Sequence, residues 1–252
     1  MNNIQDILLF PVRDAESRKQ FIIACLVMLA GFVIPLLPAF VFMGYGIKVM
    51  RQVIDEKKSP SMPSWQGIDW SETFLDGIKL YGVQLVLMLP LLALMGCGFL
   101  AMVGGSMAMS SLLMEESIRS IAPVGGIFFF IGISAMMLFS LISLPYGIIV
   151  SAAGPHVATR RTFAAGFEFK EWWAVFRKAA GQFILAYLLT FAVSFVFIFI
   201  MQIALMTIVL MCIVPFLMIP YSVYSMLISN ALLAQAYAVG SDALSKENHA
   251  TA

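Results

Sequence analysis

The stretch MGYGIKVMRQVIDEKKSPSMPSW, residues 43–65, marks the point where an apolar segment gives way to a charged loop. No charged side chain occurs between residues 20 and 47, whereas Lys48 and Arg51 follow immediately. Such a boundary between apolar and basic sequence is typical of a chain that leaves a membrane. The whole chain is organised by boundaries of this kind.

The Gly-Tyr-Gly within this stretch looks like the core of a potassium-channel selectivity filter. That filter has Thr-Val before the first glycine and is built from four loops around an axis. Here Phe42 and Met43 precede Gly44. We therefore interpret Gly44-Tyr45-Gly46 as close helix packing near the membrane boundary, with Tyr45 at the depth of the lipid headgroups.

The composition indicates that lipid is the solvent for much of the chain. Apolar residues make up 61% and charged residues 12% of its 252 residues, and the mean hydropathy is +0.94. A soluble domain carries roughly 25% charged residues. The net charge of +1 gives no field that would recruit nucleic acid. The three cysteines, Cys25, Cys97 and Cys212, lie far apart in apolar runs and do not have metal-binding spacing.

The pattern predicts an all-α fold, a polytopic transmembrane bundle of about six helices arranged as three hairpins, the first short or re-entrant. A helix needs about 20 apolar residues to span a bilayer. The charge-free stretches are 20–47, 80–114, 120–159 and 179–241. We expect one membrane-embedded domain over residues 1–240, with helices near 20–35, 38–52, 80–103, 124–150, 181–206 and 209–238. Residues 241–252 are predicted to be a flexible cytosolic tail.

The first apolar stretch, 20–47, has two interpretations. Pro35 and Pro38 lie at its middle, where proline favours a bend or kink. Lys and Arg concentrate within 13–19, 48–79 and 160–178, which places these regions in the cytosol by the positive-inside rule. The first of these regions lies on that side only if 20–47 enters and leaves through the same face. The alternative is a single span with the N-terminus outside.

Residues at the ends of the spans are candidates for contact with lipid headgroups. All four tryptophans lie in the two basic loops, and tryptophan is enriched at the membrane interface. Residues 4–10 are predicted to be an amphipathic interfacial helix, and the N-terminus does not have the pattern of a secretory signal peptide. Anionic lipid contact or ordinary positive-inside flanking both explain the basic residues. The interfacial candidates are Trp65, Trp70, His156, Arg160, Arg161, Trp172 and Trp173.

Polar residues inside the spans are few and uncharged. Ionisable groups within a membrane mark proton relays and substrate paths, and no Asp, Glu, Lys, Arg or His lies in the middle of a predicted span. No HExxH, GxSxG or P-loop motif is present. We therefore expect no catalytic residues, cofactor or metal. Gln84, Gln202 and Asn230 either form interhelical hydrogen bonds or line a path for a polar solute.

An ordered set of residues carries a family resemblance over most of the chain, to about residue 240. These residues are Phe10-Pro11, Arg18-Lys19, Ile34-Pro35, Gly44-Tyr45, Arg51, Val53, Pro63, Trp65, Phe74, Gly77, Lys79 and Leu89-Pro90, then FEF at 167–169 and PYSVYSMLISNALLAQAYAVG at 220–240. The chain resembles the bacterial and archaeal membrane family called domain of unknown function 4013. It departs from that pattern at Val12-Arg13, where members are more acidic. The resemblance implies an integral membrane protein and brings no reaction or cofactor.

The expected function is that of a non-enzymatic inner-membrane protein, an accessory, scaffold or membrane-organising component. Its basic loops and C-terminus would lie in the cytoplasm. Its partners would be the lipid bilayer, an anionic lipid, and another membrane protein or a second copy of the chain, with no nucleic acid. The alternative is an uncoupled facilitator of a small solute or lipid.

Overall fold

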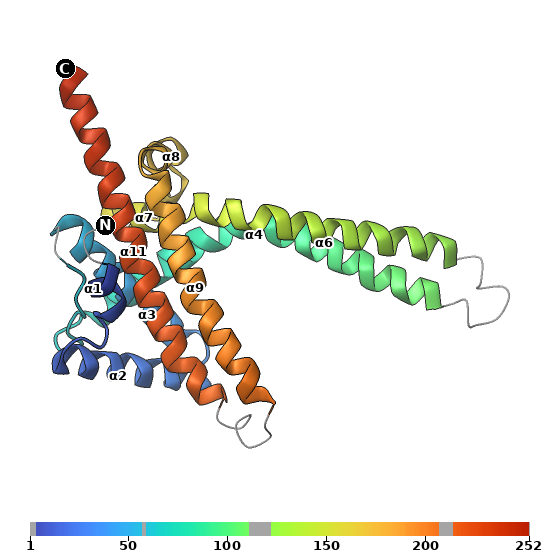
Figure 1. Ribbon diagram of the computed structural model, residues 1–252, viewed down its shortest axis with the longest axis horizontal. Coiled ribbons are helices and arrows are strands. Elements are labelled where there is room, and N and C mark those ends of the chain that lie inside the picture. Colours follow the sequence, from blue (N-terminus) through green and yellow to red (C-terminus); the bar gives the residue numbers. More distant parts are fainter. Residues whose placement is uncertain (1–3, 57–58, 111–121, 207–213, 252) are drawn as a thin grey trace. The chain divides into compact units, whose positions relative to one another are not determined.

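The computed structural model describes residues 4–56, 59–110, 122–206 and 214–251, and every regular element among them is a helix (Figure 1). The all-α prediction is confirmed. In chain order the elements are α1 (Ile4–Leu9), α2 (Ala15–Leu29), η1 (Ala30–Phe32), α3 (Leu37–Asp55), α4 (Trp70–Ser110), α6 (Ala122–Val150), α7 (Ala153–Arg160), η3 (Ala164–Phe167), α8 (Phe169–Lys178), α9 (Ala180–Leu205) and α11 (Val214–Thr251). The chain divides into two units, one within residues 1–83 and 148–252 and the other within 84–147.

Four helical segments in the described ranges are long and apolar enough to cross a membrane. They are Trp70–Ser110, Pro123–Arg160, Ala180–Leu205 and Phe216–Glu247. In the most apolar 18-residue part of each segment, only 6–33% of the residues are buried inside the protein. Large apolar side chains are thus exposed along most of each segment, as expected for helices that lipid surrounds.

Helix α4 begins ten residues before the predicted span at 80–103. The carboxylate of Asp69 accepts a hydrogen bond from the backbone N–H of Glu72 at 3.0 Å, which caps the helix start. At 1.5 Å per residue, 41 residues are much longer than the roughly 30 Å hydrocarbon core. The charged residues of α4, Glu72, Asp76 and Lys79, all lie in its first ten residues, before the apolar part begins.

The first apolar stretch forms two helices, α2 and α3, which pack against each other and are separated by a bend at residues 30–36. Pro38 lies in the first turn of α3, where a missing backbone N–H costs no hydrogen bond. Leu36 has a φ of 72°, a conformation that turns the chain sharply. Neither helix meets the length and hydropathy criteria of the four candidate spans.

Apolar side chains are exposed together along residues 32–37, which cover most of this bend and the first residue of α3. We call these residues the hairpin tip. The exposed fractions are 69% for Phe32, 83% for Val33, 53% for Ile34, 65% for Leu36 and 48% for Leu37. The backbone N–H groups of Val33 and Ile34 both donate to the carbonyl of Ala30, at 3.0 and 2.9 Å. The tip therefore combines an apolar surface with internally bonded donors, which lowers the cost of placing irregular backbone in lipid.

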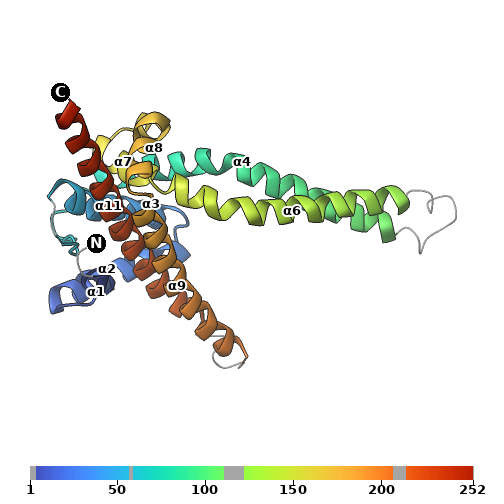
Figure 2. The same cartoon turned by 45° about the horizontal axis from the view of Figure 1, so that its top comes forward.

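Helix α11 is the centre of the first unit and packs against α1, α2, α3, α7, α8 and α9 (Figures 1 and 2). Ile7 of the short helix α1 and the adjacent Phe10 are buried in the apolar core. The hydroxyl of Tyr224 on α11 donates to the carbonyl of Leu8 at 2.9 Å. The apolar side of the predicted interfacial helix at 4–10 thus contacts protein.

Glycines allow the backbones of α3 and α4 to come into direct contact. A Cβ atom on Gly44 would lie 1.8 Å from the carbonyl oxygen of Thr73, and one on Gly77 would lie 1.8 Å from that of Phe40. A Cβ on Gly46 would lie 2.1 Å from Nδ2 of Asn230. Close helix packing at Gly44-Tyr45-Gly46 is therefore confirmed.

In the second unit, glycines likewise allow α4 and α6 to pack with their backbones in contact. Gly105 of α4 would clash with the backbone of Phe129 if it carried a Cβ, at 2.4 Å, and Gly132 of α6 would clash with Met102, also at 2.4 Å. A Cβ atom on Gly98 would lie 3.0 Å from the Cβ atom of Ala135. Residue numbers fall on α6 as they rise on α4, so these segments pack antiparallel through small residues.

Residues 241–251, predicted to be a flexible tail, are helical in the structure because α11 continues to Thr251. No glycine or proline follows Gly240 to end the helix. An ion pair of 2.6 Å joins Lys178 of α8 to Glu247.

Candidate functional site

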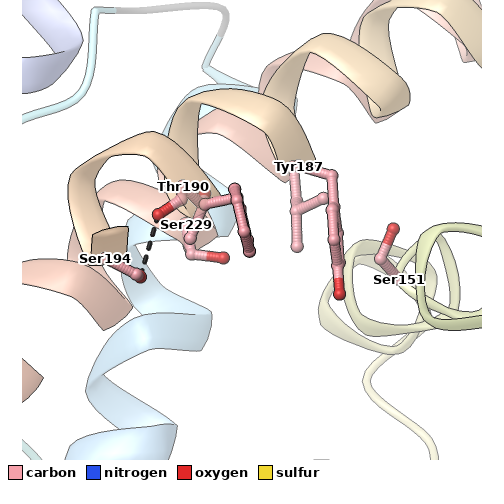
Figure 3. Close-up of a pocket in the computed structure, with 7 residues that line it drawn as sticks. Ser151, Tyr187, Thr190, Ser194 and Ser229 are labelled. Carbon is pink, nitrogen blue, oxygen red and sulfur yellow. Dashed lines mark hydrogen bonds between the residues drawn. The ribbon is translucent and has the colours of Figure 1, made fainter. Parts of the chain in front are cut away.

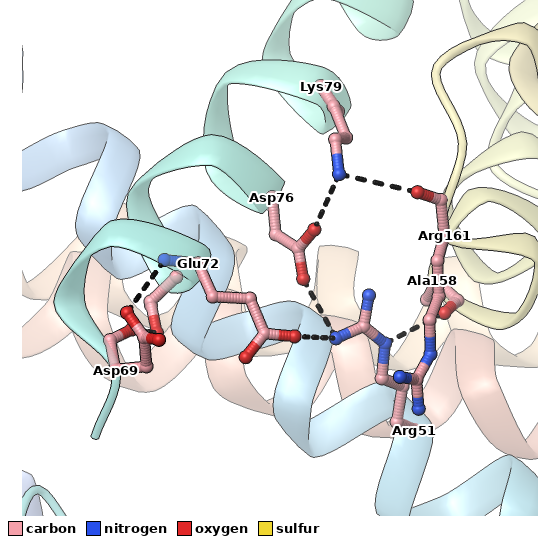
Figure 4. Close-up of polar contacts among 8 residues, drawn as sticks. Arg51, Asp69, Glu72, Asp76, Lys79, Ala158 and Arg161 are labelled. Carbon is pink, nitrogen blue, oxygen red and sulfur yellow. Dashed lines mark hydrogen bonds and ion pairs between the residues drawn. The ribbon is translucent and has the colours of Figure 1, made fainter. Parts of the chain in front are cut away.

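A buried ion pair joins α3 to the start of α4 (Figure 4). Nη1 of Arg51 lies 2.8 Å from Oδ2 of Asp76, and the two side chains are 12% and 4% exposed. Nε of Arg51 also donates to the carbonyl of Ala158 on α7 at 2.9 Å. One guanidinium group thus holds three segments that are far apart in the sequence.

Lys79 extends this group toward the end of α7. Its ammonium lies 3.2 Å from Oδ1 of Asp76 and 3.3 Å from the carbonyl oxygen of Arg161 (Figure 4). Each oxygen of the Asp76 carboxylate therefore faces a cation, and the more exposed carboxylate of Glu72 lies 3.9 Å from Arg51. Because breaking a buried pair leaves an uncompensated charge, this cluster fixes α3, α4 and α7 against one another.

A second polar cluster surrounds His156 on α7, whose side chain is 3% exposed. Nδ1 lies 2.6 Å from the hydroxyl of Tyr237 on α11, and Nε2 lies 2.9 Å from Oε2 of Glu168. Oε2 of Glu171 lies 3.7 Å from the same nitrogen. Glu171 also pairs with Arg160 at 2.5 Å. We call His156, Glu168 and Glu171 the histidine–glutamate triad.

A pocket of about 640 Å³ lies beside this triad. Residues of α3, α7, α8 and α11 line it, among them Asp55, His156, Arg160, Lys170, Glu171 and Tyr237. The lining therefore offers an imidazole, carboxylates, basic side chains and a phenol in one place. Such a mixture suits a charged ligand, and the carboxylates with the imidazole nitrogen suit a metal ion.

Trp65, predicted to anchor at the lipid interface, is buried at 6% exposure. Its backbone N–H donates to the side-chain oxygen of Gln20, and its indole N–H donates to the Gln20 carbonyl, both at 3.0 Å. Its ring stacks on Tyr45, which is itself fully buried in the protein. Trp65 therefore fastens its loop to α2 and α3 rather than presenting its ring to lipid.

The other interfacial candidates divide into buried and exposed side chains. Trp172 is 3% exposed, and its indole donates to the carbonyl of Gly166 at 3.2 Å. His156 is buried in the cluster described above. The exposed candidates are Trp70, Arg160, Arg161 and Trp173. Only these four can meet lipid headgroups without rearrangement of the protein.

The three intramembrane polar candidates do not share an environment. Gln84 and Gln202 are exposed, whereas Asn230 is buried. Nδ2 of Asn230 has no hydrogen-bond partner among the described residues. Their difference in exposure gives no support for a path lined by all three.

Hydroxyl groups gather elsewhere, in a pocket of about 290 Å³ between α9, α11 and the end of α6 (Figure 3). Its lining residues are Ser151, Tyr187, Thr190, Phe191, Ser194, Ser229 and Leu233. Thr190 and Ser194 donate to carbonyls one turn earlier on α9, at 3.0 and 2.9 Å. Their oxygens can still accept hydrogen bonds from a ligand. We call this site the hydroxyl pocket.

Several residues of these sites were not among the candidates predicted from the sequence. Asp76 lies four residues after Glu72 on α4, and its partner Arg51 is 25 residues earlier in the sequence. Glu168 and Glu171 are twelve and fifteen residues from His156, a spacing that no compact metal motif has. The sequence indicates only part of this site. In FEFKEWW, Glu168 and Glu171 are one helical turn apart and can lie on the same helix face. The Glu115–Glu116–Arg119 helix that the sequence suggests lies outside the described residues.

One titratable group outside the spans has a clear local environment. Asp14 precedes α2, and its carboxylate accepts a hydrogen bond from the backbone N–H of Ser17 at 2.7 Å. That bond favours the ionised form and lowers the pKa of the Asp14 carboxyl below its usual value. The side chain therefore caps the helix best when it is charged.

Four long apolar helices in the described ranges, with large apolar side chains exposed along them, indicate an integral membrane protein of the all-helical class. Within that class, residues 27–206 match the family described as a protein of unknown function, DUF4013. The match covers more than half of the chain, and the protein belongs to this family. No curated protein and no solved structure matches the chain.

Proposed function

We propose that this protein is a non-catalytic, membrane-organising accessory component of the bacterial inner membrane. The observation that carries the proposal is the hairpin tip, where large apolar side chains are exposed together between α2 and α3. A hairpin that enters one leaflet and returns displaces lipid on that side only. Interfacial insertion of apolar side chains responds to membrane curvature and lipid composition.

The contacts of Trp65 support the return of the hairpin to the face where it enters. Gln20 lies near the start of α2, and Trp65 lies in the loop that follows α3. Their two hydrogen bonds join this loop to α2, and the Trp65 ring stacks on Tyr45 in the middle of α3.

The ionic contacts support a common side for the basic loops and the C-terminus. Arg51 contacts Asp76, and Lys79 contacts the carbonyl of Arg161, so the loops at 48–79 and 160–178 meet. Lys178 likewise pairs with Glu247 near the end of α11. By the positive-inside rule this side would be the cytoplasm.

Partners of the accessory role would be lipid and another membrane protein or a second copy of the chain. Trp70 on α4 and Trp173 on α8 are 52% and 38% exposed, and Arg160 and Arg161 at the end of α7 are exposed as well. Aromatic and arginine side chains are enriched in binding surfaces and at lipid headgroups. These four side chains are our candidates for such contacts.

Reconstitution into vesicles tests the membrane-organising function. The variant Val33→Ser with Ile34→Ser makes the hairpin tip polar, and Val33→Leu with Ile34→Leu is the matched apolar control. We expect the wild type and the leucine control to change vesicle diameter and lipid order relative to protein-free vesicles. The serine variant should lose that change. Equal effects of the serine variant and the wild type would contradict the proposal, as would vesicles that do not respond to the wild type.

The hydroxyl pocket favours a second candidate, an uncoupled facilitator of a small polar solute or lipid. Its aromatic and hydroxyl lining suits a neutral ligand with hydrogen-bond donors. Flux of neutral solutes through proteoliposomes would test it, with Thr190→Val and Ser194→Ala as variants and Ser140→Ala, an exposed hydroxyl on α6, as control. Flux that the two pocket variants leave unchanged would contradict this candidate.

A further inference from the structure

The histidine–glutamate triad brings three potential metal-ligand atoms into one place. One atom from each of His156, Glu168 and Glu171 lies within 4.8 Å of the other two. We propose that the triad binds a divalent metal ion of the zinc class, through Nε2 of His156 and one carboxylate oxygen from each glutamate. This site is independent of the proposed membrane-organising function.

The distances fit a metal centre with small movements of the side chains. Bonds of about 2.0–2.1 Å to a tetrahedral zinc ion place neighbouring ligand atoms roughly 3.3 Å apart. Nε2 of His156 lies 2.9 Å from Oε2 of Glu168 and 3.7 Å from Oε2 of Glu171. These separations lie on either side of the required value. The glutamates are one turn apart on the segment that begins α8, so both face the same imidazole.

Tyr237 fixes the imidazole in an orientation suited to a metal ligand. Its hydroxyl lies 2.6 Å from Nδ1 of His156, and the histidine is 2% exposed. A histidine that binds a metal through one nitrogen commonly donates the N–H of the other to a nearby acceptor. With the proton on Nδ1 donated to the Tyr237 oxygen, the lone pair on Nε2 faces the two carboxylates. Burial restricts the ring to this position.

The pocket beside the triad supplies an entry path and room for a further ligand. Its volume of about 640 Å³ is lined by His156 and Glu171. Catalytic and exchangeable zinc sites use three protein ligands and leave a fourth position for water or another small ligand. A fourth ligand could therefore reach the metal through this pocket.

Arg160 competes with a metal for one of the ligands. Its guanidinium pairs with the same Oε2 of Glu171 that faces His156, at 2.5 Å. The side chains of Arg160 and Glu171 are 57% and 50% exposed, and exposed ion pairs contribute little stability. A divalent ion can displace this guanidinium. Removal of Arg160 should therefore strengthen metal binding.

The test uses the full-length protein in detergent, titrated with Zn²⁺ by calorimetry and by competition with a chromophoric chelator. We expect one Zn²⁺ per chain at this site, with weaker binding of Mg²⁺ because imidazole is a poor ligand for that ion. Glu168→Gln, Glu171→Gln and His156→Gln should each weaken Zn²⁺ binding on the order of tenfold or more. Arg160→Ala should tighten it. X-ray absorption should detect one imidazole with oxygen ligands.

Glu247→Gln is the matched control, because it also removes one exposed carboxylate that pairs with a basic side chain. It should leave Zn²⁺ affinity unchanged. Glu168 and Glu171 are 39% and 50% exposed, so their amide variants should keep the wild-type helical content even if the buried His156→Gln variant does not fold. Equal Zn²⁺ binding by the wild type and the Glu168→Gln, Glu171→Gln double variant would overturn the site. Weaker binding by Arg160→Ala would overturn it as well.

Discussion

The rings of Tyr45 and Trp65 stack with their centroids 4.3 Å apart and an angle of 1° between their planes. Tyr45 also donates a hydrogen bond of 2.6 Å from its hydroxyl to the carbonyl of Pro63. Both residues belong to the stretch in which the chain changes from apolar to basic. The stacked pair closes the loop after α3 back onto the hairpin, so this stretch organises the fold through aromatic packing.

Replacement of Trp65 should destabilise the protein much more than replacement of Trp70. Trp65→Ala removes a buried ring and two hydrogen bonds to Gln20, and such truncations cost about 3–5 kcal/mol. Trp70 is 52% exposed, so Trp70→Ala should change the free energy of unfolding by less than about 1 kcal/mol. Unfolding by titration with a denaturing detergent measures both. Similar losses in the two variants would show that Trp65 does not hold the loop as described.

Loss of one partner of the buried Arg51–Asp76 pair should cost about 3–5 kcal/mol of unfolding free energy, because the remaining charge is buried without compensation. The double variant Arg51→Met with Asp76→Leu should be more stable than either Arg51→Met or Asp76→Leu alone. Glu72→Gln is the control, since Glu72 is half-exposed and 3.9 Å from Arg51. Additive losses in the double variant would contradict a direct interaction.

An added methyl group should disrupt the contact between α3 and α4. Gly44→Ala and Gly77→Ala would each place a Cβ within 2 Å of a backbone carbonyl, which cannot move without shifting a helix. Overpacking of this kind costs about 1–3 kcal/mol. Gly181→Ala is the control because nothing lies within 4 Å of its Cβ position. Thermal unfolding followed by circular dichroism distinguishes the variants, and equal unfolding temperatures would refute the close approach.

The Asp14 cap should make stability depend on acid pH. Its pKa is lowered in the folded protein, so its contribution is present above the unfolded value, about 3.9, and is lost as pH falls through the folded value. Asp14→Asn keeps a hydrogen-bond acceptor without the charge. The difference in unfolding free energy between wild type and Asp14→Asn should therefore shrink as the pH falls below about 4. A difference that grows toward acid pH would contradict this sign.

The sequence predicted an all-helical fold with long apolar helices because charge and hydropathy define which segments can enter lipid. The bend at Pro35 and Pro38 was also predicted, since it depends on local backbone chemistry. The sequence did not predict the short helices α7 and α8 or the helical residues 241–251. The roles of Trp65 and His156 could not be predicted in this way. A tryptophan or histidine beside a basic loop has the same sequence environment whether its ring faces lipid or protein. Their burial depends on Gln20 and Tyr237, which lie 45 and 81 residues away.

The central claim is that α2 and α3 enter the membrane and return through one face. Arg13→Cys and Ser61→Cys, each in a chain whose native cysteines are replaced, report the two ends of the hairpin, and Ser110→Cys reports the opposite face. A membrane-impermeant maleimide applied outside intact cells should label position 110 and leave positions 13 and 61 unlabelled until the membrane is permeabilised. Labelling of position 13 with protection of position 61 would show a single span and contradict the claim.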